Sequence, residues 1–461
     1  MAGKMTLRRA GPVAWLLIAG FVLCAAINLP GHLSYDSVMQ LNEGRRGFYA
    51  NWHPPMMSWL LGVFDWLWRG AALFVLFDLA LFFGSLGALV WLTPAGSKAP
   101  LVVLALMIVT PQVLLYEGIV WKDVLFADLA VAGFAALAVA GERWDRARLR
   151  YAAIVAAFSL FAVATLVRQN GGIVLPAGVA ALAWIAWKKG STARLRAGFL
   201  YGLSALAGSA IAVVAIHSAL ALRIPGDPSP AVGFRLLQFY DLIGAIKAKP
   251  TLELPYFEDD DDTLEALMRT DGVRLYTPER NDTLAQSQRL QSAYFASPAE
   301  TIPEEWHRLI AVHPGLYLRV RAEVFRWIVL TPDLAACRPV YSGIDGPAPQ
   351  MKKLGLTKRF DARDAALDFY AKRFIGTPVF SHLFFILLAI ASLVLLFARR
   401  TAADIAIAFM LISTLAFTLS FFVIAIACDY RYLYFLDLAT MAAVFHLSLD
   451  WRSAWKAVRS P

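Results

Sequence analysis

Apolar stretches of about twenty residues recur along this 461-residue chain and constrain its fold more than any other feature. A stretch of that length crosses the hydrocarbon of a membrane as one helix. Hydrophobic residues make up 59% of the sequence and charged residues only 17%, which excludes a soluble globular enzyme and a disordered chain. Ten spanning helices are predicted, at residues 12–28, 71–92, 100–116, 124–140, 151–167, 172–187, 197–222, 377–397, 403–427 and 432–449. The fold class is therefore an all-α polytopic membrane protein.

The net charge of +9 follows the predicted topology. With the N-terminus in the cytoplasm, the cytoplasmic segments contain 17 Lys or Arg but only four Asp or Glu. This asymmetry is the positive-inside pattern of membrane proteins, so the basic balance does not indicate a nucleic-acid partner. We expect both termini to be cytoplasmic, the first helix to remain uncleaved, and the membrane to be a bacterial inner membrane. Three cysteines are too few for a disulfide framework.

Hydropathy divides the chain into three parts. Residues 1–222 are predicted to form an N-terminal transmembrane block, whose first external loop spans 29–70. Residues 223–376 contain 20 basic and 21 acidic residues and are predicted to form a mainly helical, soluble domain in the periplasm. Residues 377–461 then form a C-terminal transmembrane block with the last three spans.

The first external loop contains the residue with the clearest chemical potential. Ser34 is a good N-cap and predicts a short interfacial helix with Tyr35 at its start and Asp36 in its first turn. A carboxylate at that depth can take the proton of an acceptor hydroxyl while the hydroxyl attacks a lipid-linked sugar. The structural alternative is that Asp36 only stabilises the N-terminus of the helix.

A second signal in this loop is the sequence Trp52-His53-Pro54-Pro55. The two prolines exclude helix before them and fix where the next helix starts. His53 is then held at a helix N-terminus, where backbone donors favour an anion such as phosphate. Alternatively, Trp52 and His53 only anchor the chain at the membrane interface.

Three other predicted external loops carry a cation at the same depth as Asp36. Each cation can bind the phosphate of a lipid donor, and each also has an ordinary reading as a snorkelling side chain, a turn or an interface anchor. The phosphate-binding candidates are Lys122, Arg168 and Arg431, with supporting roles for Asp123, Gln169, Asn170 and Tyr432. Acids inside predicted helices are expected to be structural, at Asp78, Asp128 and Asp437.

The loop motif resembles that of the GT-C superfamily of glycosyltransferases, in the branch of the protein O-mannosyltransferases and the lipid A aminoarabinose transferases. The matching residues are Tyr35-Asp36-Ser37 and His53-Pro54-Pro55-Met56-Met57-Ser58-Trp59-Leu60. The resemblance implies a polyprenyl-phosphate sugar donor, inversion at the anomeric carbon and Asp36 as the general base. Many members have Asp-Glu where this chain has Asp36-Ser37, which leaves the use of a divalent cation such as Mg²⁺ or Mn²⁺ open.

These observations favour a membrane glycosyltransferase that works on the periplasmic face. The acceptor is expected to belong to the cell envelope: lipid A, an O-antigen or other glycan, or a protein. The rival class is a multi-pass transporter or lipid flippase for an envelope precursor. Transporters typically have repeat symmetry and a site at the membrane midplane, whereas the polar residues here gather at one face.

Overall fold

The computed structural model describes residues 11–50, 54–93, 97–190, 194–224, 231–260 and 262–451. Within these ranges the chain is built from helices, and β-structure is limited to isolated bridges. The chain forms two compact units, which are described separately. Unit 1 contains Met1–Gly226, Val340–Phe417 and Leu433–Pro461, and unit 2 contains Asp227–Pro339 and Thr418–Tyr432.

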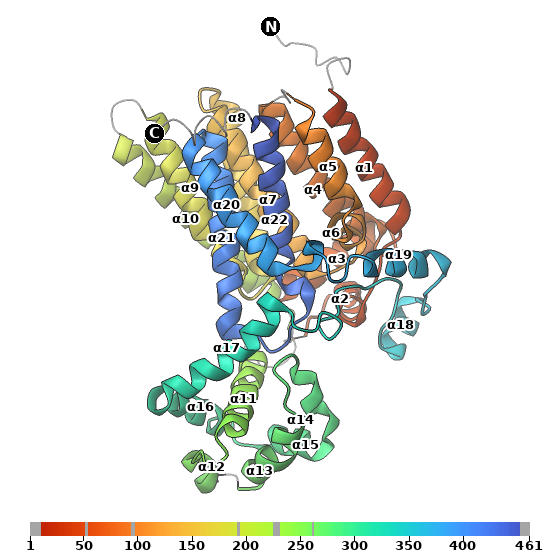
Figure 1. Ribbon diagram of the computed structural model, residues 1–461, viewed down its shortest axis with the longest axis vertical. Coiled ribbons are helices and arrows are strands. Elements are labelled where there is room, and N and C mark those ends of the chain that lie inside the picture. Colours follow the sequence, from red (N-terminus) through yellow and green to blue (C-terminus); the bar gives the residue numbers. More distant parts are fainter. Residues whose placement is uncertain are drawn as a thin grey trace. The chain divides into compact units, whose positions relative to one another are not determined.

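Unit 1 contains a bundle of long apolar helices (Figure 1). All ten predicted spans coincide with helices of the described chain. They are α1 (Pro12–Asn28), α4 (Ala72–Leu92), α5 (Ala99–Val109) with α6 (Pro111–Leu114) and η2 (Tyr116–Gly118), α7 (Lys122–Glu142), α8 (Ala147–Val167), η3 (Gly171–Ile173) with α9 (Val174–Lys189), α10 (Arg194–Ala221), α20 (His382–Arg399), α21 (Ala402–Ile424), whose last residues belong to unit 2, and α22 (Tyr434–Leu449).

Eight of these described helices are long and apolar enough to cross a membrane singly. The predicted span at 100–116 is instead bent by 66° where Pro111 follows α5, since proline cannot continue the hydrogen-bond ladder of a helix. Counting that bent pair as one span gives nine. The first predicted span is α1, whose 17 residues are fewer than those of any of the eight spans.

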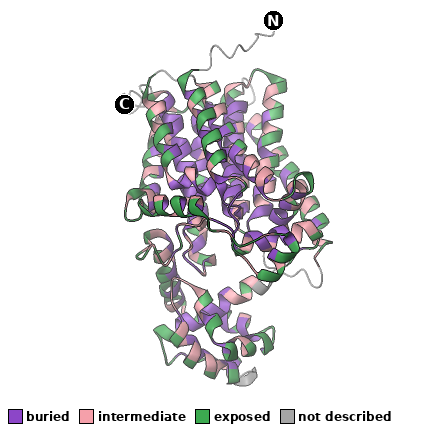
Figure 2. Cartoon of the chain, turned by 90° about the vertical axis from the view of Figure 1, so that its right-hand side faces the viewer, coloured by how far each residue is buried: buried purple, intermediate pink, exposed green. Residues whose placement is uncertain are grey.

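Helices α7 and α22 lie in the interior of the bundle, where 89% of the span of each is buried, whereas the corresponding value for α10 is 17%. Figure 2 shows the buried residues concentrated within the bundle. Small residues let α7 approach its neighbours closely. A Cβ on Gly133 would lie 2.3 Å from the ring of Phe161, and one on Gly141 would lie 2.8 Å from Ala402. The interior is therefore set by close helix packing.

The first external loop folds into two short helices, α2 (Tyr35–Arg46) and α3 (Pro55–Leu67). Both starts confirm the sequence analysis, because Ser34 is the N-cap of α2 and the proline pair begins α3. The two helices cross at Gly44, where a Cβ would lie 2.1 Å from the carbonyl oxygen of Ser58. Beside the crossing, the Ser58 hydroxyl donates to Glu43 at 2.7 Å. The pair thus forms a fixed hairpin.

Alanine at position 44 is expected to destabilise unit 1 by about 1–3 kcal/mol, because the added methyl group meets backbone atoms that cannot rotate away. The measurement is the Tm of the purified protein in detergent. Gly84→Ala is the matched control, since a Cβ on Gly84 meets nothing within 4 Å and alanine favours a helix. Equal melting temperatures for the two variants would contradict the close crossing.

Unit 2 is a small helical domain. Its described elements are α11 (Ala231–Ala248), α12 (Pro255–Asp260), α13 (Asp262–Leu267), η4 (Met268–Gly272), α14 (Val273–Leu275), η5 (Asn281–Gln286), α15 (Gln288–Ala296), α16 (Thr301–Val312), α17 (Pro314–Leu330) and η7 (Tyr430–Leu433). At its centre, the fully buried Arg321 pairs with Asp241 at 2.7 Å. Arg321 also donates to the carbonyls of Phe422 and Ala425, both at 2.8 Å. One side chain therefore joins the two chain stretches of the unit.

A disulfide between Cys337 and Cys428 joins the same two stretches. The cysteine count excluded a framework of several disulfides but did not predict this single bridge. The two cysteines are 91 residues apart, so only the fold brings them together. Cys24, in α1, is buried and free.

The predicted periplasmic segment 223–376 is shared between the units. Its stretch Asp227–Pro339 packs in unit 2, whereas Val340 and the residues after it pack in unit 1 with α18 (Ala348–Leu354), α19 (Ala362–Lys372) and η6 (Pro378–Phe380). The reason is a backbone connection, because Ile344 forms bridges with Leu33 and with Arg359. This polar stretch therefore belongs to the helical bundle's own unit.

Candidate functional site

The backbone between α1 and α2 is held on two sides. On one side, His32 exchanges hydrogen bonds with the segment before α7, donating to Gly118 at 2.9 Å and accepting from Val120 at 3.0 Å. On the other side, Leu33 donates to the Gly343 carbonyl at 2.9 Å. Two distant parts of the sequence thus fix the backbone directly before Asp36.

Side chains extend this connection to Asp36 and Lys122. The Ser37 hydroxyl donates to the Val120 carbonyl at 2.6 Å, and the Trp121 indole donates to the Ser34 hydroxyl at 3.0 Å. Asp36 adjoins Ser37, and Lys122 adjoins Trp121. The structure therefore places the first turn of α2 beside the N-terminus of α7.

Asp36 is half-buried in the first turn of α2, as expected. The turn is stabilised by Ser37, whose hydroxyl accepts a hydrogen bond from the Ser34 backbone at 3.2 Å. Tyr35 is 62% exposed, while Val38 is fully buried. Tyr35 therefore projects from the surface of unit 1, whereas Val38 packs inside it.

Asp123 and Arg168 form an ion pair between α7 and the end of α8. Both side chains are buried, and the Arg168 guanidinium also lies 5.4 Å from the centre of the Phe417 ring. Lys122, the first residue of α7, is half-buried at the same helix end. One acid and two cations from the sequence analysis therefore meet where α7 begins.

The residues after Arg168 form a tight connection to α9. Gln169 is exposed and Asn170 is half-buried. A Cβ on Gly171 would lie 2.5 Å from the Ala164 carbonyl. Glycine is thus needed at position 171 for the close approach of the chain to α8.

Two other candidates have their partners within unit 2. Arg431 and Tyr432 belong to unit 2, where Arg431 pairs with Asp429 at 3.4 Å and Tyr432 stacks on Phe421. His53 lies outside the described residues. In unit 1, the structure therefore brings together Asp36, Lys122, Asp123 and Arg168.

The sequence analysis missed the polar cluster that holds this loop from the other side. Arg363 donates to the Leu29 carbonyl at 2.6 Å, and Arg359 donates to the Gly31 carbonyl at 3.3 Å. Arg359 also pairs at 2.9 Å with the buried Asp364. The only sequence signal is the run of alternating charges at 358–364, more than three hundred residues after the loop.

His32 is the buried centre of that cluster. The Gly343 backbone donates to Nδ1 of His32 at 2.9 Å, so the ring proton is on Nε2, which donates to Asn28 at 3.1 Å. Burial lowers the pKa of His32 from 6.5 to about 4, despite the nearby carboxylate of Asp364. His32 is therefore neutral near pH 7.

Acidification is expected to destabilise unit 1 through His32. The contribution of the neutral His32 ring to the free energy of unfolding is fully present above pH 6.5. It is lost as the pH falls towards about 4, because the unfolded chain binds a proton that the folded chain excludes. The full loss corresponds to about 3 kcal/mol. Melting temperatures between pH 7.5 and 4.5 should fall less steeply for His32→Gln than for the original protein. Parallel curves would show that His32 is not the titrating group.

The described residues offer no ready metal site. No three His, Cys, Asp or Glu side chains within the described ranges are arranged to hold an ion. Asp78, Asp128 and Asp437 are buried in α4, α7 and α22. The nearby Glu117 contacts the Tyr434 hydroxyl at 2.9 Å. We therefore derive no chemical step through a divalent cation.

Comparisons with known proteins give only distant matches. No model of a protein family matches the chain, and no curated protein matches its sequence. The apo crystal structure of the oligosaccharyltransferase of Archaeoglobus fulgidus is similar over 99% of this chain and 52% of that one, with 13% identity and a TM-score of 0.41. The archaeal oligosaccharyltransferase AglB from Archaeoglobus fulgidus, in complex with an inhibitory peptide and a dolichol-phosphate, is similar with the same identity and TM-score, over 97% of this chain and 51% of that one. The chain thus spans about half the length of those structures.

Proposed function

We propose that this protein is a membrane glycosyltransferase of GT-C type that moves a sugar from a polyprenyl-phosphate donor to a cell-envelope acceptor. The observation that carries the proposal is the hydrogen bond from Ser37 to Val120, which brings the turn containing Asp36 to the N-terminus of α7. A carboxylate and a cationic helix end next to one another are the two groups that this transfer needs.

In the proposed reaction, Asp36 acts as the general base. The acceptor hydroxyl oxygen attacks the anomeric carbon of the donor sugar while Asp36 takes the hydroxyl proton. The bond between the anomeric carbon and the phosphate oxygen breaks, and its electron pair leaves with the lipid phosphate. Attack from the face opposite the phosphate inverts the anomeric carbon.

The proposed phosphate site is built around Lys122. Its ammonium group and the positive end of the α7 helix dipole both favour an anion. Arg168 is held by Asp123 and adds positive charge at the same helix end. His53 and Arg431 remain proposed phosphate contacts from the sequence analysis, with Gln169, Asn170 and Tyr432 in support.

We propose that the reaction takes place on the periplasmic side of a bacterial inner membrane. The disulfide of unit 2 supports this orientation, because disulfides persist in the periplasm and are rare in the cytoplasm. The charge asymmetry of the loops also supports it. An envelope acceptor such as lipid A, an O-antigen or a protein would be reached from that side.

The test is mass spectrometry of envelope glycans from the native host after deletion of the gene. We expect one sugar residue to disappear, to return with the original protein, and to stay absent with Asp36→Asn. Asp145→Asn is the matched control, because Asp145 is exposed and follows α7 at the helix end opposite Lys122. Full restoration by Asp36→Asn would exclude Asp36 as the base and would favour the transporter.

A further inference from the structure

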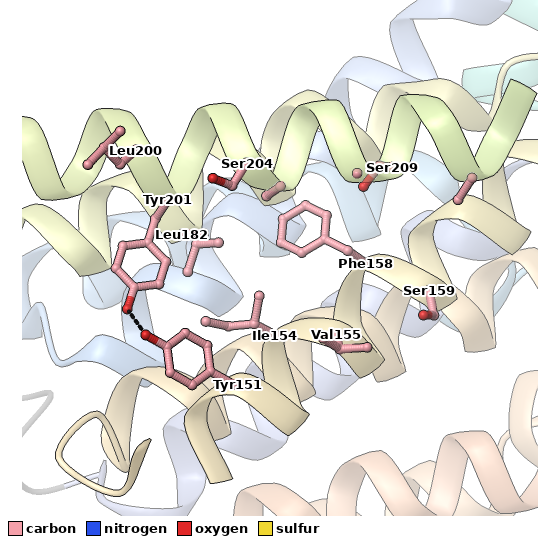
Figure 3. A pocket seen from close by; sticks show the side chains of 13 residues that line it. Tyr151, Ile154, Val155, Phe158, Ser159, Leu182, Leu200, Tyr201, Ser204 and Ser209 are labelled. Atoms are coloured by element: carbon pink, nitrogen blue, oxygen red, sulfur yellow. Dashed lines mark hydrogen bonds between the residues drawn. The ribbon is translucent and has the colours of Figure 1, made fainter. Parts of the chain in front are cut away.

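A groove of about 540 Å³ lies on the bundle between α8, α9 and α10. Its lining is mainly apolar and includes Ile154, Val155, Phe158, Leu182 and Leu200. Figure 3 shows Leu182, Ile154 and Phe158 between the two hydrogen-bonded tyrosines Tyr151 and Tyr201 at one end and Ser159 and Ser209 at the other. All three helices are long and apolar enough to span a membrane. The groove therefore opens on a surface of the kind that faces lipid.

The tyrosine end of the groove carries the positive charge of the half-buried Arg150. The Arg150 guanidinium lies 4.6 Å from the centre of the Tyr151 ring and 6.0 Å from that of Tyr201. One of its nitrogens donates to the Trp144 carbonyl at 2.7 Å, while Nε is buried without a hydrogen-bond partner among the described residues. The groove is thus apolar along its length and cationic at one end, which is the complement of an anionic lipid.

The position of Arg150 separates this groove from the proposed donor site. Arg150 lies in the first turn of α8, whereas Arg168 directly follows its last residue. The 21 residues of α8 cover about 30 Å, the thickness of the hydrocarbon layer. A lipid with its phosphate at Arg150 would therefore have its headgroup at the opposite membrane surface from Lys122 and Arg168.

The length of the groove fits one leaflet. Along α10 the lining runs from Leu200 to Ala212, which is about 18 Å of helix. Half of the hydrocarbon layer is about 15 Å thick. An acyl chain that starts at the tyrosines would thus extend to about the middle of the membrane.

We propose that this groove binds one acyl chain of an anionic glycerophospholipid, with the lipid phosphate at Arg150 and the tyrosine hydroxyls. The site is separate from the transfer site and does not depend on the proposed function. It would fix α10, the most exposed of the long helices, against α8 and α9.

The test uses the full chain, delipidated in detergent and titrated with phosphatidylglycerol or phosphatidylcholine, with bound lipid counted by native mass spectrometry. We expect one phosphatidylglycerol per chain, bound about tenfold more tightly than phosphatidylcholine. Arg150→Gln should remove that preference. Arg148→Gln should keep it, because Arg148 is exposed on the same helix, whereas Arg150 is the arginine that lies over both tyrosine rings. Equal affinity of the original protein for the two lipids would overturn the proposal.

A second pair of variants tests the groove itself. Gly208→Phe should fill it and abolish binding of both lipids, because a Cβ on Gly208 meets nothing within 4 Å. Gly84→Phe, at an equally open position on α4, should leave binding unchanged. Ser204→Phe, also on the groove, repeats the test if Gly208→Phe unfolds. Retained lipid in a folded groove variant, or a tenfold preference for a polyprenyl phosphate over phosphatidylglycerol, would overturn the assignment.

Discussion

Asparagine in place of Asp36 is expected to slow sugar transfer by about 100- to 10,000-fold, the usual contribution of a general base. Asparagine has nearly the same size and keeps the first turn of α2, but it cannot accept the hydroxyl proton. The measurement is the rate at which purified protein in proteoliposomes releases polyprenyl phosphate. The donor carries the sugar that is lost from the deletion strain.

Two comparisons make this result specific to proton transfer. Asp36→Glu keeps a carboxylate and is expected to retain more activity than Asp36→Asn. Lys122→Met is expected to lower the rate by weakening stabilisation of the leaving phosphate, but it should keep the pH dependence that the base gives the original protein. A wild-type rate for Asp36→Asn, with the chain folded, would exclude Asp36 from the chemistry.

Replacing Arg321 with methionine is expected to destabilise unit 2 by about 3–5 kcal/mol, because it leaves the carboxylate of Asp241 buried without its partner. The Phe422 and Ala425 carbonyls lose their donor in the same step. The measurement is limited proteolysis of the full chain at rising temperature, scored by cleavage within residues 262–330.

Arg326→Met is the matched control for that prediction. Arg326 lies on the same helix, is 57% exposed and forms only a surface pair with Glu323, so its removal should change stability by less than about 0.5 kcal/mol. The double variant Arg321→Met with Asp241→Leu should regain part of the lost stability, because no buried charge is left alone. Equal protease resistance of Arg321→Met and the original protein would contradict the role of the pair.

The spans and the starts of α2 and α3 could be predicted because each depends on neighbouring residues. An apolar stretch in lipid must satisfy its own backbone as a helix, and Ser34 and the proline pair act within one turn. Hydropathy alone did not predict the bend at Pro111, because the apolar stretch continues on both sides of that proline.

The residues that hold the loop before α2 in place could not be predicted in this way. His32 accepts a hydrogen bond from the backbone of Gly343, 311 residues later. No local sequence pattern around either residue predicts this contact. The disulfide between Cys337 and Cys428 could not be predicted for the same reason. Nor could the packing of residues 340–376 in unit 1. The carboxylate and the cations of the site could be named from loop positions, whereas the residues that hold the loop depend on the tertiary fold.

The divided construction of unit 2 has a consequence for biosynthesis. Its first stretch ends at Pro339, and its second begins only at Thr418, after α20 and most of α21. At about 5–20 residues per second, the ribosome needs on the order of ten seconds to add the intervening chain. During that interval Cys337 is a thiol without its partner, and Arg321 still lacks the two carbonyls that it binds in the finished protein. The nascent domain is therefore expected to depend on chaperones and thiol oxidants until the last helices have been made.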